Sequence, residues 1–424
     1  MVPDNYSMKS IWLPILLIII LFPELRAQPS SNVDWDYEIR LMARELSARH
    51  PDLFFSTDSA WYNLAMEQVI KETPGKSLFQ VSVRLQQVLA AMGDAQTLVN
   101  YHFLVERSRI LPFECYWFED GIFILECDKA YESLLGKKLT AVNGVPMEVV
   151  IDSLATLLVA DNQMVLKNQI PRMLTWFQLL EYFGFASGND ISFEAEDASG
   201  KTISQNILLP VELGEMVSIE PPVLPLGWQD QKAFFRAQYL EKEKIYYIQY
   251  NRCWSREAEE DYGSGASALF MPSFKEFEKQ VYPVLKKKEI DKLVFDIRFN
   301  KGGYAEQGTE FIRKICKSLP RDHREIYVLI GRATDAAAII NAVDFMKNTE
   351  VVLVGEETSG KLNFFGEVDR FVLPESRLIV SYSTKHFVLV DEEQPALIPD
   401  LTTPLYFEEY SRGIDPAMEL IRKR

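Results

Sequence analysis

The spacing of hydrophobic residues changes twice along the chain and so predicts three structural parts. In residues 28–107, apolar side chains recur at helical intervals, in Trp35–Leu46, Ser59–Ile70 and Leu78–Met92. Asp58 is a candidate N-cap for the second helix, because its carboxylate can accept a hydrogen bond from the first helical turn. We therefore expect an N-terminal helical domain over residues 28–107.

Residues 108–215 have the pattern of a small α+β module. A hairpin is expected around Glu119–Gly121 and a second tight turn at Asn143–Gly144, because Asp-Gly and Asn-Gly pairs favour hairpin turns. The other expected elements are a helix and two strands, over Met147–Leu158, Ile191–Ala195 and Lys201–Leu209. Residues 216–240 contain three prolines and are expected to form a connector.

Residues 241–424 alternate between strand and helix patterns. Strands are predicted over Lys244–Tyr250, Lys292–Phe299, Glu325–Gly331 and Glu350–Glu356, with helices over Ser273–Lys288, Ala305–Leu319 and Asp335–Lys347. Such alternation implies right-handed crossovers and a parallel sheet, so the fold class of this part is α/β. A later hairpin is expected from Arg370–Val372 and Arg377–Tyr382.

The first 27 residues have the pattern of a signal peptide. Lys9 precedes the apolar run Ile11–Phe22, which is shorter than the roughly 20 residues of a membrane-spanning helix. Pro23 ends the run, and Ala27 offers a small residue at a suitable cleavage point. We expect an exported chain, periplasmic or extracellular, with no membrane span after cleavage of residues 1–27. A short uncleaved anchor is the alternative.

Composition narrows the possible partners. Lys plus Arg number 45 and Asp plus Glu 61, and the net charge of −16 would repel phosphate backbones, so general nucleic-acid binding is not expected. No metal or cofactor is expected either, since His102, His323 and His386 lack metal-ligand spacing and no phosphate-loop or dinucleotide fingerprint is present.

Four cysteines in 424 residues are too few for a disulfide scaffold. Cys115 and Cys127 flank the first hairpin turn. A two-residue loop at Asp120–Gly121 would place position 115 opposite position 126 and turn Cys127 to the other face. Buried free thiols are therefore favoured over a bridge.

The loops after three consecutive predicted strands carry the candidate chemistry. In an open α/β sheet, ligands bind beyond the carboxyl ends of the strands. The first loop contains Gly302 and Gly303, the second leads through Asp335 into a helix, and the third contains Lys361. Exposed backbone N–H groups and a helix N-terminus on one edge favour stabilisation of an oxyanion. Taken singly, these features are also typical of a tight turn, a helix N-cap and a solvated loop lysine.

Three segments in order, Phe295–Gly303, Val328–Ala338 and Val354–Lys361, resemble the carboxyl-terminal-processing, or tail-specific, serine peptidases. Other segments are similar to secreted bacterial relatives of that family: Gly93–Thr97 to a GDxHT element, Gly136–Val145 to a PDZ-type module and Arg412–Pro416 to a closing G-x-D-P element. The resemblance implies a ClpP/crotonase-like catalytic core over residues 241–424, and a PDZ-like module over residues 108–215 that binds extended peptides or protein C-termini.

The family uses a serine nucleophile and a lysine general base. The resemblance places the base at Lys361, the nucleophile at position 336, and the oxyanion donors at Gly302 or Gly303 and at Ala337. Position 336 is alanine, however, and Gln96 replaces the histidine of the GDxHT element. Loss of a nucleophile typically lowers kcat about 10⁶-fold, so covalent catalysis by the family mechanism is not expected.

Two functions are therefore predicted as alternatives. The first is a catalytically degenerate, peptide-binding homologue of the tail-specific peptidases, in which Ala336 replaces the nucleophile. The second is an active serine-type peptidase that hydrolyses peptide bonds through a surrogate nucleophile, with Lys361 as base. The surrogate candidates are Thr334, Ser359, Ser381 and Ser383. The first is favoured, because a methyl group cannot attack a carbonyl.

Overall fold

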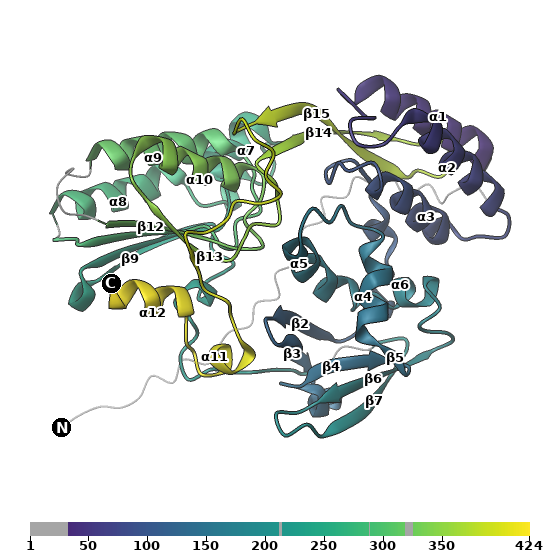
Figure 1. Cartoon of the computed structure of the whole chain (residues 1–424), viewed down its shortest axis with the longest axis horizontal. Coiled ribbons are helices and arrows are strands. Elements are labelled where there is room, and N and C mark those ends of the chain that lie inside the picture. Colours follow the sequence, from purple (N-terminus) through teal and green to yellow (C-terminus); the bar gives the residue numbers. More distant parts are fainter. Residues whose placement is uncertain (1–32, 212–213, 288, 319–324) are drawn as a thin grey trace.

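The computed structural model describes residues 33–211, 214–287, 289–318 and 325–424, and the predicted signal peptide, residues 1–27, lies outside them. Figure 1 shows three parts: N-terminal helices, a central module that includes residues 113–218, and a core built around a parallel sheet.

The three predicted N-terminal helices are present as α1 (Trp35–Arg49), α2 (Ser59–Glu72) and α3 (Leu78–Ala90). The Asp58 carboxylate caps α2, accepting a 2.8 Å hydrogen bond from the Trp61 N–H as predicted. The hydrophobic core of these helices is completed from the other end of the chain, by the hairpin of β14 (Asn363–Val372) and β15 (Ile379–Val388). β15 pairs with β1 (Leu98–Val99), and Figure 1 shows the hairpin reaching from the core to the helices.

The central module is a mainly antiparallel sheet covered by helices. Its strands follow the order β2-β3-β4-β6-β7, with β5 paired to β4 and β8 paired to β3. Their bounds are β2 (Phe113–Phe118), β3 (Gly121–Asp128), β4 (Lys138–Val142), β5 (Val145–Pro146), β6 (Asp190–Glu196), β7 (Thr202–Leu208) and β8 (Met216–Ser218); the helices are α4 (Met147–Ala155), α5 (Gln163–Met173) and α6 (Phe177–Tyr182). The predicted Asn143–Gly144 turn is confirmed by φ angles of 47° and 76°.

The first hairpin has a different register from the one predicted. Its two-residue loop is Glu119–Asp120, because Phe118 pairs with Gly121, and a bulge follows Glu114. Cys115 consequently faces Ile124 instead of position 126. All four cysteines are free, and burial raises the pKa of the Cys127 thiol to about 11.

The core sheet has the strand order β16-β13-β12-β11-β10-β9. The strands are β9 (Phe235–Leu240), β10 (Ile245–Tyr250), β11 (Lys292–Asp296), β12 (Glu325–Ile330), β13 (Val352–Gly355) and β16 (Leu401–Thr402). All neighbours from β10 to β16 are parallel, which confirms the predicted parallel sheet. β9 lies in the segment predicted to be a connector and pairs antiparallel with β10, and residues 216–218 form β8 of the central module. That prediction was wrong because strand pairing orders these residues: β9 pairs with the next strand, β10, and β8 pairs with the distant β3.

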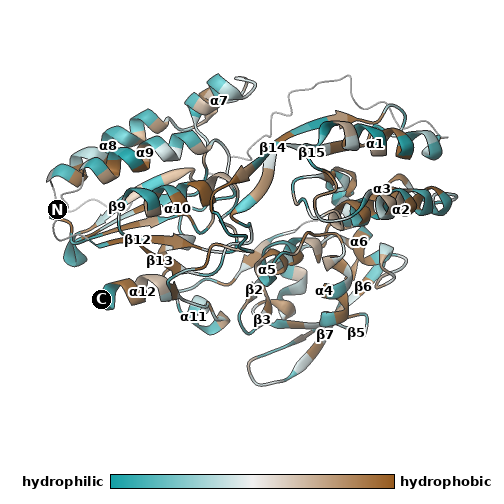
Figure 2. Ribbon diagram, turned by 45° about the horizontal axis from the view of Figure 1, so that its top comes forward, coloured by the Kyte–Doolittle hydropathy of each residue, from teal (hydrophilic) through white to brown (hydrophobic). Residues whose placement is uncertain are grey.

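Helices cover both faces of the core sheet. α8 (Phe274–Lys287), α9 (Ala305–Ser318) and α10 (Ala337–Asn348) pack on one face, and α12 (Pro416–Lys423) packs on the other. Two shorter helices, α7 (Arg256–Tyr262) and α11 (Phe407–Ser411), lie in the connecting segments. Figure 2 shows the hydrophobic character of the sheet between these layers, which explains why β11 is buried on both faces as predicted.

Glu257 on α7 caps the start of α8, and this contact should make stability depend on pH. The carboxylate accepts hydrogen bonds from the Ser273 hydroxyl and, at 2.9 Å, from the Phe274 N–H. Burial alone would raise its pKa, but these bonds outweigh burial and lower the pKa of Glu257 to about 2. A depressed folded-state pKa stabilises the protein above the unfolded pKa of about 4.5, and this stabilisation is lost as the pH falls toward about 2.

We therefore expect Glu257→Gln to lower the free energy of unfolding by about 1–2 kcal/mol at neutral pH. The difference from the wild type should shrink as the pH falls from about 5 to about 2. Urea unfolding at a series of pH values measures it, with the exposed neighbour Glu260→Gln as the matched control. A difference independent of pH would contradict the assignment.

Candidate functional site

The loops after β11, β12 and β13 meet at one edge of the sheet, as predicted. A Cβ placed on Gly302 would lie 3.1 Å from both the Ala336 Cβ and the Ala337 nitrogen. A Cβ placed on Gly360, beside Lys361, would lie 2.4 Å from an Asp335 carboxylate oxygen. The glycine loop, the opening of α10 and the loop of Lys361 therefore share one small region.

Ala336 holds a tight strand-to-helix turn with an unfavourable backbone conformation. Its φ of 47° and ψ of −114° lie in a region that residues with a Cβ rarely adopt. Such a conformation costs about 1–3 kcal/mol and persists only where the surrounding structure imposes it. The geometry is kept although the side chain is only a methyl group.

Asp335 is not the N-cap of α10, although an aspartate at the start of a predicted helix is typical of an N-cap. The cap position is Ala336, and no side chain caps the helix there. The Asp335 carboxylate instead accepts a 2.8 Å hydrogen bond from the adjacent Ala336 N–H. Burial raises the pKa of Asp335, opposed by this bond and by Lys301. The helix begins at Ala337, two residues beyond the predicted start at Asp335, because the strained turn occupies the residue before it.

Relief of this strain should be measurable. We expect Ala336→Gly to raise the free energy of unfolding by about 1 kcal/mol, since glycine tolerates positive φ and the relief exceeds its added chain entropy. Ala338→Gly, in the regular first turn of α10, should lower stability by about 1 kcal/mol or more. Chemical denaturation of both variants measures these changes. If both variants change the free energy of unfolding in the same direction, Ala336 is not strained.

The available N–H donors differ in part from the predicted set. The Gly302 N–H donates a 2.9 Å hydrogen bond to the Asn300 side chain, so it is occupied. The Gly303 and Ala337 N–H groups have no acceptor within the described part of the chain. Gly303 is held by close contact with Cys253, whose carbonyl accepts a 2.6 Å hydrogen bond from the Tyr304 N–H. Gly303 and Ala337 are therefore the better pair of oxyanion donors.

The Lys361 amine does not contact Ala336. Its nitrogen lies 3.4 Å from an Asp161 carboxylate oxygen and 5.7 Å from the ring centre of Phe55. It lines a cavity of about 330 Å³ with residues of the N-terminal helices and the β14–β15 hairpin, and Ala336 is not among the lining residues. The fold brings the loop of Lys361 to the site but directs its amine toward Asp161 in the central module.

Two of the four surrogate nucleophile candidates, Thr334 and Ser381, have hydroxyl groups engaged in hydrogen bonds. The buried Thr334 hydroxyl donates to the Ile297 carbonyl at 2.8 Å and accepts from the Gly331 N–H. The Ser381 hydroxyl accepts a hydrogen bond from Asn100. Ser383 is fully buried and its backbone N–H donates to Thr97, but its hydroxyl has no hydrogen-bond partner within the described residues. Ser359 is half-buried in the loop of Lys361.

The Gly93–Thr97 element forms a buried structural link. The Asp94 carboxylate accepts hydrogen bonds from the Thr97 hydroxyl and contacts His50 Nε2 at 3.0 Å. Burial alone would raise the pKa of Asp94, but these bonds lower it. Thr97 in turn accepts a hydrogen bond from the Ser383 N–H of β15. His50 was missed from sequence, because nothing in its spacing connects it with Asp94.

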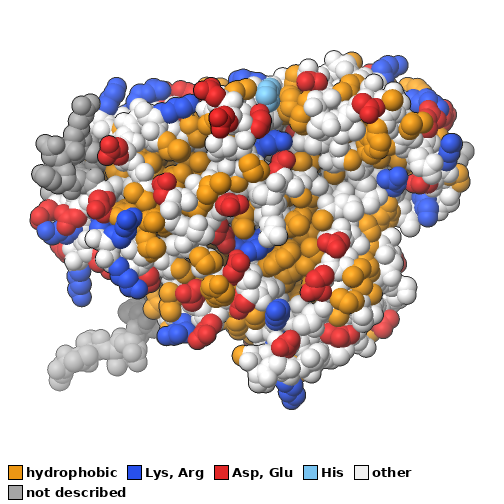
Figure 3. Space-filling model, viewed as in Figure 1, with side chains coloured by type: hydrophobic (Ala, Val, Ile, Leu, Met, Phe, Trp, Pro, Cys, Tyr) orange, Lys and Arg blue, Asp and Glu red, His pale blue; other side chains and the backbone are white. Residues whose placement is uncertain are grey.

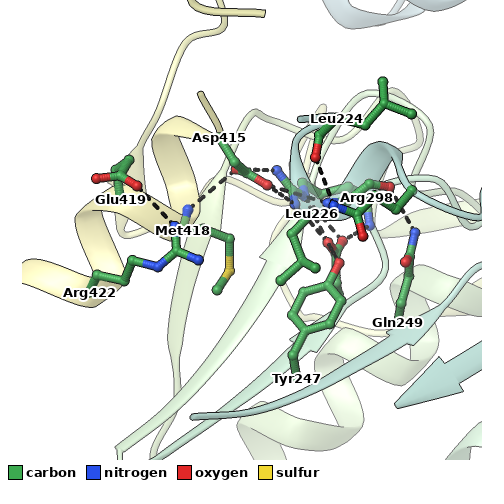
Figure 4. Close-up of polar contacts among 12 residues, drawn as sticks. Leu224, Leu226, Tyr247, Gln249, Arg298, Asp415, Met418, Glu419 and Arg422 are labelled. Atoms are coloured by element: carbon green, nitrogen blue, oxygen red, sulfur yellow. Dashed lines mark hydrogen bonds and ion pairs between the residues drawn. The ribbon is translucent and has the colours of Figure 1, made fainter. Parts of the chain in front are cut away.

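The Arg412–Pro416 element anchors the end of the chain to β11. The Arg298 guanidinium binds both Asp415 oxygens, at 2.9 and 2.8 Å, and also binds Asp296. The side chains of Arg298, Asp296 and Asp415 are only 14%, 1% and 4% exposed. Figure 4 shows Arg298 directed toward Asp415, close to Tyr247, whose hydroxyl donates to Asp296. This cluster is structural and holds the strand end that leads to the glycine loop.

A cavity of about 960 Å³ lies between the central module and the core, next to these loops. We call it the main cavity; residues lining it include Cys115, Arg172, Arg252, Lys301 and Arg332. Figure 3 shows hydrophobic side chains gathered where the two parts meet, with basic side chains among them. Arg172, Arg252 and Lys301 were not singled out from sequence, because only the fold brings them to one cavity.

Metal-ligand clusters and membrane-spanning helices are both absent from the described residues. No group of three or more His, Cys, Asp and Glu side chains there is arranged to hold a metal ion, and His323 lies outside those residues. No helix in the described ranges is both long enough and apolar enough to cross a membrane.

Comparison with known proteins identifies the fold. No family model and no curated protein sequence matches the chain. Mature CPAF complexed with lactacystin is similar in structure, with a TM-score of 0.62 and 11% identity over 92% of this chain and 97% of that chain. Mature CPAF in a second structure gives a TM-score of 0.61 at 12% identity, over 92% and 96%. The photosystem II D1 C-terminal processing protease gives a TM-score of 0.40 at 15% identity, over 91% of this chain and 99% of that chain. Along nearly its whole length, the chain thus has the fold of mature CPAF.

Proposed function

We propose that this protein is an exported, peptide-binding homologue of the tail-specific serine peptidases that no longer forms an acyl-enzyme. The strained turn at Ala336 carries the proposal. It is the geometry that presents a nucleophile from the start of a helix, yet the side chain is a methyl group. The sequence resemblance and the CPAF-like fold support the family assignment.

The surroundings of the turn support peptides as ligands. The free N–H groups of Gly303 and Ala337 are suited to a carbonyl oxygen, and the nearby residues Lys301 and Ala333 line the main cavity. The resemblance of the central module to PDZ-type domains adds a surface that takes up extended chains or C-termini. Natural ligands would then be segments of other proteins.

The lysine position also favours the inactive alternative. A general base must reach the proton that it removes, at about 2.6–3.2 Å. The Lys361 amine is engaged by Asp161 and covered by Phe55. The amine therefore does not stand where a general base for residue 336 would be needed.

The decisive experiment compares the purified mature protein with Ala336→Ser and Lys361→Ala on an unfolded, alkylated protein substrate. We expect no turnover by the wild type and no labelling by a serine-reactive fluorophosphonate. Ala336→Ser should become labelled at residue 336, while Ala338→Ser, its control in the regular helix, should not.

Wild-type cleavage that Lys361→Ala abolishes would overturn the proposal in favour of an active peptidase. In that case, mass spectrometry of the labelled wild type locates the surrogate, with Ser359 the first candidate because it lies in the same loop as Lys361. Export is tested separately, by the N-terminus of the secreted chain, which should begin at Gln28.

A further inference from the structure

We propose that the main cavity binds one carboxylate of a peptide ligand through Arg172, Arg252 and Lys301. This inference rests on the proposed function, because it takes the ligand to be a peptide, and it adds the chemical group by which the ligand is recognised. The three residues come from different parts of the chain. Arg172 is on α5 of the central module, Arg252 follows β10, and Lys301 is in the glycine loop.

Ion pairing divides the six basic residues of the main cavity into two sets. Lys167 pairs with Glu119 at 2.6 Å, Arg298 with Asp296 and Asp415, and Arg332 with Glu356. The other three, Arg172, Arg252 and Lys301, make no ion pair within the described residues. In a chain with a net charge of −16, three exposed and unpaired cations that line one cavity indicate a site for an external anion.

The three cations are close enough to affect one another. Burial, followed by the charges of Arg172 and Arg252, lowers the pKa of Lys301, and Asp335 offsets this only in part. Aromatic rings support both arginines, with Arg172 5.3 Å from the centre of Trp176 and Arg252 4.6 Å from that of Phe234. An anion bound between them would relieve this mutual repulsion.

A carboxylate fits the site in geometry and position. Arginine binds a carboxylate through two parallel N–H donors. Lys301 directly precedes Gly302 and Gly303, so a peptide held by one carboxylate can present its backbone to the free Gly303 N–H. A carboxylate held by all three residues would also link the central module, which carries Arg172, to the core, which carries Arg252 and Lys301.

The remaining acidic residues of the cavity limit the ligand to a low negative charge. Glu356 and Asp415 are neutralised by their arginine partners, but Glu114 and Glu126 face each other across β2 and β3. Burial and the charge of Glu114 raise the pKa of Glu126. These two carboxylates would repel additional charges, so a peptide with a single carboxylate should be preferred over a polyacidic one.

The test uses three dansyl-labelled peptides of alanine, leucine and serine that differ only in carboxylates. The first has a free C-terminus, the second is amidated, and the third is amidated with one internal glutamate. Fluorescence anisotropy should show the first or third peptide binding the mature protein about tenfold more tightly than the second. A tighter first peptide assigns the site to a terminal carboxylate, and a tighter third peptide assigns it to an acidic side chain.

Lys301→Gln and Arg172→Gln should each weaken the preferred peptide about tenfold and leave the amidated neutral peptide unchanged. Lys301→Arg should retain binding, and Lys201→Gln, exposed in a loop of the central module, serves as the charge-matched control. Unfolding midpoints establish that each variant is folded. If Lys301→Gln does not fold, binding by Lys301→Arg and Arg172→Gln still decides the test.

Equal binding of all three peptides would overturn the carboxylate site while leaving peptide binding intact. Equal losses of affinity for the preferred peptide in Lys301→Gln and Lys201→Gln would also overturn the carboxylate site. Failure of every peptide to bind would overturn both this inference and the proposed function.

Discussion

Replacement of Arg298 by methionine should lower the free energy of unfolding by about 3–5 kcal/mol. Methionine keeps much of the side-chain volume but leaves the carboxylates of Asp296 and Asp415 buried without their cation. At present, burial alone would raise the pKa of Asp415, and the Arg298 charge reverses this and lowers it. Without Arg298, one carboxylate must take up a proton or the contact between α12 and β11 must open.

Urea unfolding of Arg298→Met measures this loss, and Arg422→Met is the matched control. Arg422 pairs with Glu243 and Glu419 at the surface, where ion pairs contribute about 0–1 kcal/mol. The loss of unfolding free energy in Arg298→Lys should be intermediate, because lysine keeps the charge but not the bidentate contact with Asp415. A loss below about 1 kcal/mol for Arg298→Met would contradict a role for the cluster in holding the chain end.

The second large effect is expected at Gly303. A Cβ at this position would lie 2.4 Å from the Cys253 carbonyl oxygen, and φ is 129°. Gly303→Ala should therefore destabilise the protein by about 2–4 kcal/mol, as strain and overlap combine. Because the loop must move, the preferred peptide of the binding test should also bind more weakly.

Gly184→Ala separates steric overlap from backbone preference. Gly184 also has a positive φ, of 79°, but a Cβ there would meet nothing within 4 Å. Gly184→Ala should lower the free energy of unfolding by only about 1 kcal/mol and leave peptide binding unchanged. Chemical denaturation and the same anisotropy assay are the measurements, and equal losses from both variants would argue against a close contact at Gly303.

Local patterns predicted the elements that build the site but not which atoms in it are free. Hydrophobic periodicity predicted α1 to α3 and the alternating strands and helices of the core, since each buries an apolar face. It did not find β9, because an edge strand is stabilised by its pairing with β10. It also did not separate Gly302, whose N–H is bound by Asn300, from Gly303, whose N–H is free.

The sequence by itself predicted that strand exits carrying Gly302, Ala336 and Lys361 would come to one edge of a parallel sheet, because the carboxyl ends of parallel strands lie at the same edge. It also shows alanine at residue 336, where the resemblance to the tail-specific peptidases would place a serine. Only the tertiary structure decided where the Lys361 amine points and that Arg172, Arg252 and Lys301 line one cavity. Side-chain directions and contacts between distant segments depend on how separate parts pack against one another, which no local spacing of residues specifies.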